Sequence, residues 1–281
     1  MYKPNGIRIK MHNDVLRLRK QGLSYKEIIN EIEKSYGDKL SKSTVSYWCR
    51  GVHSPYNVRR IPSIEFLKPS PELAYIIGTV IGDGFLKIVK KKRKGYNEVY
   101  IELETRDLDF AEEFGRCLGV VLNRQPPKPR YRRTRNTYVV SVKDKTLFEL
   151  LRGRELEKLR PFIEYNEECK KMFLRGFFDS EGCVSKYGNI SCCNANYELL
   201  KYVHGLLNDL GIQSTVPHPY VKKETPIICP RTGRIYRRKK DVYYIYIRRS
   251  SLPVFYQKVN FTIIRKRRIL EEYLRGRGLL K

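Results

Sequence analysis

Two stretches of the chain are almost wholly apolar, with small residues at intervals, and each ends in an acidic side chain followed by glycine. The first is Tyr75–Gly84 (YIIGTVIGDG) and the second is Phe173–Gly182 (FLRGFFDSEG). Their apolar runs predict buried helices, which we expect over 71–83 and 167–180. The sequence Ser70-Pro71-Glu72 favours the first of these starts. It offers a capping hydroxyl, a proline in the first turn and a carboxylate near the positive end of the helix dipole.

A similar order of elements follows each of these helices. In the first half we expect a strand from 85, a basic turn over 90–95, a strand over 99–104, a helix near 109–118, strands around 130 and 139, and a helix near 145–151. In the second half we expect strands near 184, 190, 215 and 244, and helices at 197–210 and from 264 onward. The predicted fold class is therefore α+β, a pseudo-twofold pair of αββαββα units. Each half contributes one sheet with one face on helices and one face free.

The first 50 residues predict three short helices, which form a small all-α domain. We expect Asn13 to cap a first helix that runs to about 20, with Gly22 ending it. Ser24 and Glu27 have the spacing of a capping box, which predicts the start of a second helix with isoleucines along one side. The third helix is predicted to begin near 43.

The third predicted helix places Val45 and Trp48 three residues apart, where they can share a small core. The segment 16–51 resembles the helix-turn-helix domains of repressors and resolvases, whose last helix lies in the major groove. A three-helix module for protein docking is the alternative. The resemblance implies that six residues face DNA: Lys42, Ser43, Thr44, Ser46, Tyr47 and Arg50.

Three prolines, several basic residues and no periodicity between 51 and 70 predict a linker. The predicted domains are a helix-turn-helix domain over 1–54, a linker over 55–70, a first repeat over 71–160 and a second repeat over 161–281.

Charge narrows the class of partner. The 57 Lys and Arg residues exceed the 30 Asp and Glu residues, giving a formal net charge of +27. This excess favours nucleic acid as the partner, ahead of an anionic membrane surface. No apolar run approaches the roughly 20 residues of a membrane span, and the first 20 residues are too charged for a signal peptide. We therefore expect a cytoplasmic protein that acts on chromosomal DNA, without membrane association, and with its seven cysteines reduced.

Each apolar helix carries two small residues four positions apart, Gly78 with Gly82 and Gly176 with Ser180. Residues at this spacing lie on one helix face, and small side chains let two backbones approach closely. The two helices are therefore expected to pack along these faces.

Close packing would bring Asp83 and Glu181 together at one end of the helix pair. A carboxylate at a helix C-terminus faces the negative end of the dipole, so its charge needs an offset. Two adjacent anions attract divalent cations, and the following glycines, Gly84 and Gly182, can leave the helices in a left-handed conformation.

These stretches resemble the paired signature helices of the LAGLIDADG homing endonucleases, in the single-chain form with two signatures. The resemblance covers about 73–274 and fits the archaeal intron-encoded members. It implies that Asp83 and Glu181 are the catalytic acids. One departure is Ile81, where the signature usually has an acid; Asp179 fills that place in the second helix, and we interpret the position as structural.

The resemblance also implies the chemistry. Mg²⁺, or Mn²⁺, would be held by Asp83, Glu181 and the backbone carbonyls of Gly82 and Ser180, and water activated by metal would cut both strands with short 3′ overhangs. The protein would act as a monomer with internal pseudo-twofold symmetry on double-stranded DNA with a long recognition site. Four polar residues are candidates for polarising water, although a solvated surface role explains each equally well: Lys87, Thr105, Arg106 and Lys186.

The free sheet faces are expected to read the major groove, where Arg and Lys suit guanine and Asn suits adenine. Contact with phosphate or solvent is the alternative for any single residue. The candidates are Arg132, Arg133, Arg135, Asn136, Arg234, Arg237, Arg238, Tyr244, Tyr246 and Arg248. Two other functions use the same parts: a non-catalytic DNA-binding transcriptional regulator and an RNA intron maturase.

Overall fold

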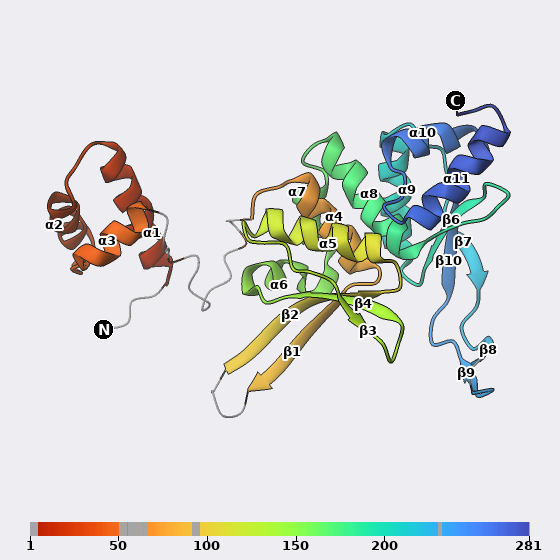
Figure 1. Ribbon diagram of the computed structural model, residues 1–281, viewed down its shortest axis with the longest axis horizontal. Helices are drawn as coiled ribbons and strands as arrows, with labels where there is room; N and C mark the ends of the chain where they lie inside the picture. Colours follow the sequence, from red (N-terminus) through yellow and green to blue (C-terminus); the bar gives the residue numbers. More distant parts are fainter. Residues whose placement is uncertain are drawn as a thin grey trace. The chain divides into compact units, whose positions relative to one another are not determined.

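The computed structural model describes residues 5–50, 55, 64, 67–91, 96–229 and 232–280 (Figure 1). The chain divides into two compact units, residues 1–66 with 145–147, and residues 67–144 with 148–281. Most of the predicted linker over 55–70 and much of the predicted basic turn over 90–95 lie outside the described residues. Across the described residues, no helix has both the length and the apolarity that a membrane crossing requires.

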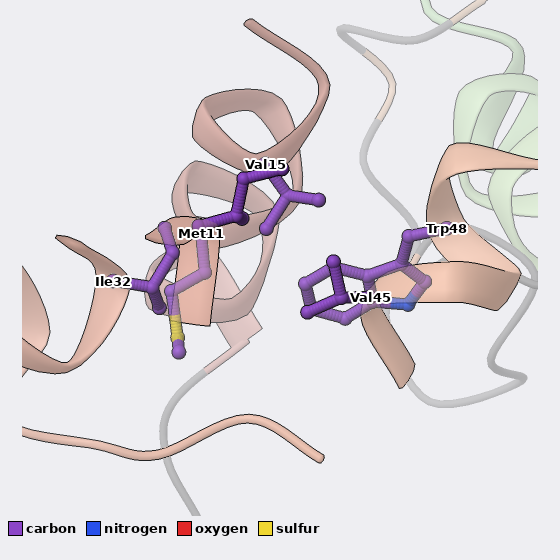
Figure 2. Close-up of a cluster of buried hydrophobic side chains, with 6 residues drawn as sticks. Met11, Val15, Ile32, Val45 and Trp48 are labelled. Carbon is purple, nitrogen blue, oxygen red and sulfur yellow. The ribbon is translucent and has the colours of Figure 1, made fainter. Parts of the chain in front are cut away.

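The N-terminal unit contains three helices: α1 (Asn5–Lys20), α2 (Tyr25–Tyr36) and α3 (Lys42–Cys49). Figure 2 shows side chains from all three meeting in one core, with Trp48 and Val45 of α3 directed towards Met11 and Val15 of α1. This core explains why so short a unit can fold, since each helix buries its apolar side against the other two.

The predicted capping box of α2 is confirmed. The Ser24 hydroxyl accepts from the Glu27 amide, and the Glu27 carboxylate accepts from the Ser24 amide at 2.7 Å. The predicted start of α1 is wrong, because Asn13 lies inside a helix that begins at Asn5. Burial of Met11 one turn before Val15 stabilises this upstream part, so tertiary packing overrides the local cap signal.

The larger unit is built around α4 (Pro71–Ile81) and α8 (Glu167–Glu181), which pack against each other. Ser70 caps α4 through the Leu73 amide, with Pro71 in the first turn, as predicted. Asn166 caps α8 in the same way through the Cys169 amide. Nine consecutive residues of α4, from Leu73 to Ile81, are buried, so this helix forms the centre of the unit.

The first half continues from α4 into one antiparallel sheet with helices on one side (Figure 1). Its strand order is β1-β2-β4-β3, and Ile101 and Leu103 of β2 point into the core while Glu102 and Glu104 alternate with them. Its elements are β1 (Phe85–Lys91), β2 (Tyr96–Thr105), α5 (Leu108–Val121), β3 (Arg130–Arg132), β4 (Thr137–Val142), α6 (Lys145–Leu151), a 3₁₀ turn (Arg152–Arg154) and α7 (Leu156–Ile163).

The second half repeats this plan with the strand order β5-β6-β10-β7, so the predicted α+β pseudo-twofold fold is confirmed. The strand predicted near 215 begins slightly later, at His218, and is preceded by an isolated bridge between Ser214 and Ile247. The elements are β5 (Gly182–Val184), β6 (Ile190–Asn194), α9 (Tyr197–Asp209), β7 (His218–Val221), β8 (Pro226–Ile228), β9 (Ile235–Arg237), β10 (Val242–Tyr246), a 3₁₀ turn (Arg249–Ser251), α10 (Leu252–Lys258) and α11 (Ile264–Gly276).

Candidate active site

The two central helices are in backbone contact along their small residues, as predicted. A Cβ atom placed on Gly78 would lie 2.2 Å from the carbonyl oxygen of Phe173, and one on Gly176 would lie 2.4 Å from that of Tyr75. A Cβ on Gly82 would lie 2.4 Å from the Cβ of Ser180. No side chain larger than hydrogen fits these places while the helices keep this spacing.

This contact brings the two acidic side chains to the same end of the helix pair. Glu181 is the last residue of α8 and is half-buried, and Asp83 follows α4 by two residues and is exposed. Burial raises the pKa of Glu181 to about 7, and the neighbouring Asp83 carboxylate adds to this shift. The pKa of Asp83 is raised as well, because the site removes part of its hydration. Both raised pKa values indicate that this site disfavours two ionised carboxylates without a cation between them.

Asn194, at the end of β6, donates its side-chain amide to the Glu181 carboxylate at 3.2 Å. Asn194 also accepts from the amide of Asn196, two residues on, and in the first half the Thr105 hydroxyl accepts from the amide of Asp107 in the same manner. The predicted residue Thr105 and the unpredicted Asn194 are therefore counterparts in the two halves.

Basic side chains from outside the helix pair cap both acid-bearing helices. Arg154 donates to the carbonyl oxygens of Ile81 and Gly84 at 3.1 and 2.7 Å. Lys266, buried in α11, donates to the carbonyl oxygens of Phe178 and Asp179 at 3.2 and 2.6 Å. These cations offset the negative ends of the two helix dipoles, next to the acids.

Neither capping residue was predicted, because no local pattern distinguishes these two from the other Lys and Arg residues. Arg154 reaches α4 because Gly153 and Arg154 both have left-handed backbones, with φ of 81° and 53°. Glycine adopts this conformation without strain, and the chain turns sharply as a result.

Asp179 is structural, as interpreted from the sequence. It is 1% exposed and accepts hydrogen bonds from the Tyr75 hydroxyl at 2.9 Å and from the amides of Thr262 and Ile263 at 2.9 and 3.3 Å. Burial raises its pKa to about 6, and these donors oppose the shift. Asp179 thus ties the segment before α11 to the helix pair, whereas Ile81, its counterpart in α4, is an apolar buried residue.

The predicted left-handed conformation of the closing glycines is wrong. Gly182 has φ −81° and ψ 145°, and Gly84 does not have positive φ either. Glycine is required at these two positions because there is no space for a side chain. A Cβ on Gly84 would lie 2.5 Å from the Cα of Val80, and one on Gly182 would lie 2.3 Å from the carbonyl oxygen of Phe178. Each chain folds back tightly against its own helix as it enters the first strand.

The donor atoms at this end of the helix pair suit a hard divalent cation. The carboxylates of Asp83 and Glu181 lie close enough to interact, and carboxylate oxygens are ligands of the kind that Mg²⁺ prefers. Among the described residues no group of three or more His, Cys, Asp or Glu side chains converges. Phosphate oxygens and waters would therefore supply the remaining ligands.

Three of the predicted water-polarising residues lie on three different segments of the larger unit. Lys87 is exposed on β1 opposite Tyr100, and Arg106 is exposed at the turn between β2 and α5. Lys186 lies in the turn between β5 and β6 with its ammonium over the ring of Tyr187, and it lines a surface pocket with Tyr273 of α11. The structure therefore places Lys186 with α11 instead of with the acid pair.

On the free face of the first sheet, several polar side chains are paired with one another around Glu104. Arg132 and Arg135 both contact the Glu104 carboxylate, at 2.9 and 3.4 Å, and the Thr137 hydroxyl donates to it at 2.7 Å. Arg133 and Asn136 are exposed in the turn between β3 and β4, where the Tyr131 hydroxyl donates to Asn136. The strands predicted around 130 and 139 are present as β3 and β4.

The second sheet presents a row of aromatic rings. The Tyr244 ring lies 4.2 Å from that of Tyr220 and 5.6 Å from that of Tyr246, and His218 stacks on Tyr246 at 5.8 Å. Among the predicted basic residues, Arg234 and Arg237 are exposed around β9, Arg238 is half-buried and Arg248 is exposed after β10.

In the N-terminal unit, α3 buries Val45 and Trp48 and turns its polar residues outward. Lys42, Ser43, Tyr47 and Arg50 are exposed, with the Arg50 guanidinium over the Tyr47 ring, and Thr44 and Ser46 are half-buried. The helix is only eight residues long.

Comparison with known proteins agrees with this geometry. A family model described as a LAGLIDADG-like domain matches residues 168–260. The uncharacterized protein MJ0398 of Methanocaldococcus jannaschii is 34% identical over 95% of this chain and 93% of its own length. A second uncharacterized protein of that organism, MJ0314, is 34% identical over 53% of this chain and 58% of its own.

Among solved structures, the homing endonuclease I-DmoI in complex with DNA and Ca has a similar fold. The TM-score is 0.51 at 22% identity, covering 72% of this chain and 97% of that one. With the two close-packed helices and the two equivalent sheets, the chain therefore contains a LAGLIDADG-like domain and has the fold of I-DmoI.

Proposed function

We propose that the protein is a site-specific double-strand DNA endonuclease that depends on divalent metal. The observation that carries this proposal is the meeting of Asp83 and Glu181 at one end of two helices in backbone contact. Two acids held together in this way have a high cost unless a cation joins them. A helix crossing with a purely structural role would not require two acids at this position.

The residues of the site have separate roles in this proposal. Asp83 and Glu181 bind Mg²⁺ or Mn²⁺, together with the backbone carbonyls of Gly82 and Ser180. When bound, such a cation supplies an activated water nucleophile and stabilises the leaving 3′ oxygen. Arg154 and Lys266 hold the helix ends in place, and Asn194 orients the Glu181 carboxylate. The two carboxylates then serve the two strands, which leaves short 3′ overhangs.

The proposed substrate is double-stranded DNA with a long recognition site, bound by one chain. Support comes from the net charge of +27, from the two free sheet faces and from I-DmoI, a protein of similar fold solved in complex with DNA. This substrate agrees with the expected location, which is the cytoplasm, where the protein would act on chromosomal DNA. The outward residues of α3 would add helix-turn-helix contacts on one flank of the site.

A second candidate is RNA binding in support of intron splicing. The row of four aromatic rings on the second sheet favours it, because unpaired bases stack on aromatic side chains. RNA binding on this row would give the acid pair no role, so the endonuclease remains the main proposal. A non-catalytic DNA-binding regulator is the remaining alternative.

The test is cleavage of a randomised duplex library with Mg²⁺ or with chelator, followed by sequencing of the ends. Metal-dependent cuts with short 3′ overhangs at one motif would support the proposal. Asp83→Asn should then lower the cleavage rate at least about 1,000-fold, which corresponds to the several kcal/mol that metal-ion catalysis contributes. DNA affinity should stay within about threefold, because one carboxylate contributes little to phosphate binding.

Asp209→Asn is the matched control. It makes the same change on α9, where Asp209 pairs with Lys170 at the surface, and it should cut normally. Tight binding without cuts would favour the regulator, and cleavage by Asp83→Asn at the normal rate would refute the proposed site.

A further inference from the structure

The second sheet carries an insertion that the first sheet lacks. By position in their sheets, β7 and β10 correspond to β3 and β4. A four-residue turn, 133–136, joins β3 to β4, whereas residues 222–241 separate β7 from β10. We call this insertion the finger. It contains β8 and β9, which pair with each other and extend away from the helices (Figure 1).

The base of the finger is ordered by hydrogen bonds and continues the strand pair below it. The Lys223 amide donates to the Asp241 carboxylate at 2.7 Å, the Glu224 amide donates to the Arg238 carbonyl at 2.9 Å, and the Arg238 amide donates to the Thr225 carbonyl at 3.1 Å. The finger is therefore a built extension of the second sheet. β8 and the residue on either side of it, 225–229, are hydrogen-bonded to the opposite side of the finger and span roughly 16 Å at about 3.3 Å per residue, the length of about five base pairs.

The outer end of the finger exposes apolar side chains. Ile228 and Ile235 lie opposite each other in the strand pair and are 66% and 68% exposed. Ile227 and Tyr236 form the next pair, on the opposite face, and are 39% and 53% exposed. Residues directly opposite in an antiparallel pair share a face, so each face of the finger has an apolar pair on it. Exposed apolar groups gathered on one element indicate a binding surface.

The positive charge around these apolar pairs indicates that the partner is DNA. The finger contains eight Lys and Arg residues and two acidic residues. Arg234 and Arg237 flank the Ile235 pair on β9 and are exposed. A two-stranded ribbon has the width that the major groove admits, and apolar side chains there contact the C5-methyl group of thymine. Cations beside the ribbon neutralise the phosphates on either side.

We propose that the finger extends DNA recognition beyond the half-site bound by the second sheet, placing Ile228 and Ile235 against thymine methyl groups in the major groove. The inference rests on the proposed function. It assigns the protein an asymmetric recognition site, longer by about five base pairs on one flank and rich in thymine there.

The test has two parts. First, a library with randomised flanks is selected by binding to the full-length protein and to a variant in which Arg-Thr-Arg-Asn, the turn between β3 and β4, replaces residues 223–240. The variant should lose selection on one outer flank only. Second, deoxyuridine replaces thymidine in that flank, which removes only the methyl group. Affinity should fall about fourfold for each contacted methyl, the factor expected for one buried methyl-sized group.

The double variant Ile228→Ser with Ile235→Ser should bind uracil and thymine flanks equally and should still select the central base pairs. Val120→Ser is the matched control, since Val120 is 52% exposed on α5, and it should keep the uracil penalty. A flank that tolerates uracil, or equal flank selection with and without the finger, would overturn the inference while the proposed cleavage could stand. Binding of the finger to anionic vesicles with no flank selection would overturn it as well, and failure to select any DNA would refute both proposals.

Discussion

Two carboxylates at the ends of neighbouring helices are an unstable arrangement unless their surroundings are adapted to them. Here Arg154 donates to a carbonyl oxygen at the end of α4, and Lys266 donates to one at the end of α8. The side-chain amide of Asn194 donates to the Glu181 carboxylate. The cations oppose the helix dipoles but do not form ion pairs with the acids. The carboxylate oxygens thus remain available for a divalent ion, which is the chemistry that the proposed function needs.

The raised pKa of Glu181 leads to a prediction about stability. Its folded-state pKa is about 7 and its usual value is near 4.5. The folded protein therefore binds this proton more tightly than the unfolded chain does, and stability falls as pH rises through this range. In chelator, Glu181→Gln should leave stability nearly unchanged at pH 4.5. It should increase the free energy of unfolding at pH 8 by up to about 3 kcal/mol.

Denaturant titration at both pH values measures this effect. Magnesium should stabilise the wild-type protein at pH 8 and should stabilise Glu181→Gln much less, because the variant lacks one of the two anions. Glu157→Gln on α7 is the matched control, since its side chain is 84% exposed, and it should show neither effect. Equal stabilisation of wild type and Glu181→Gln by magnesium would contradict the assignment of Glu181 as a metal ligand.

Among the elements, the packing of α4 on α8 determines whether the acids meet. Gly78→Ala or Gly176→Ala would place a methyl group 2.2 or 2.4 Å from a carbonyl oxygen of the other helix. Because backbone atoms cannot move aside as a side chain can, we expect each to lower the free energy of unfolding by about 2–4 kcal/mol. Cleavage should also fall, because the acids would move apart.

Gly205→Ala is the matched control for these changes. Gly205 lies within α9 with no atom within 4 Å of the added methyl group. Alanine is the better helix former there, so this variant should be more stable by about 0.5–1 kcal/mol. Denaturant unfolding of the three variants measures the contrast. A Gly78→Ala protein as stable as Gly205→Ala would show that the helices do not pack this closely.

Elements with local signals could be predicted from the sequence, and those formed by tertiary packing could not. The cap of α4, the capping box of α2 and the close-packed glycines depend on spacings of three or four residues, and all are present. The start of α1 and the helices α7 and α10 depend on distant contacts. In the same way, Arg154 and Lys266 reach the site from separate elements, so no motif marked them.

On the scale of the larger unit, the two halves share a topology but differ in their free faces. The first sheet presents paired polar side chains around Glu104, and the second presents aromatic rings and the finger. The repeat in element order predicted the common topology. The pairing of β8 with β9 into a separate ribbon was not predicted, because these strands are three residues each and bury no apolar face, which leaves no periodic signal.

The N-terminal unit gives the last prediction. It has its own core, so deletion of residues 1–54 should leave the larger unit folded. If α3 contacts DNA, the truncated protein should bind about 10- to 100-fold more weakly, with a shorter footprint and a smaller salt dependence, because fewer phosphates are neutralised. The rate of cleavage at saturating protein should change less than about threefold, since both acids remain.

Two pairs of substitutions in the full chain test the same contact without removing the unit. Lys42→Ala with Arg50→Ala removes two exposed cations from α3 and its C-terminal end, and it should reproduce most of the loss in affinity. Lys26→Ala with Lys34→Ala removes two cations from α2 and is the matched control, with affinity expected within about twofold. If the α2 pair and the α3 pair weakened binding equally, the unit would contribute only diffuse charge. If truncation changed neither affinity nor footprint, the proposal that α3 contacts DNA would be wrong.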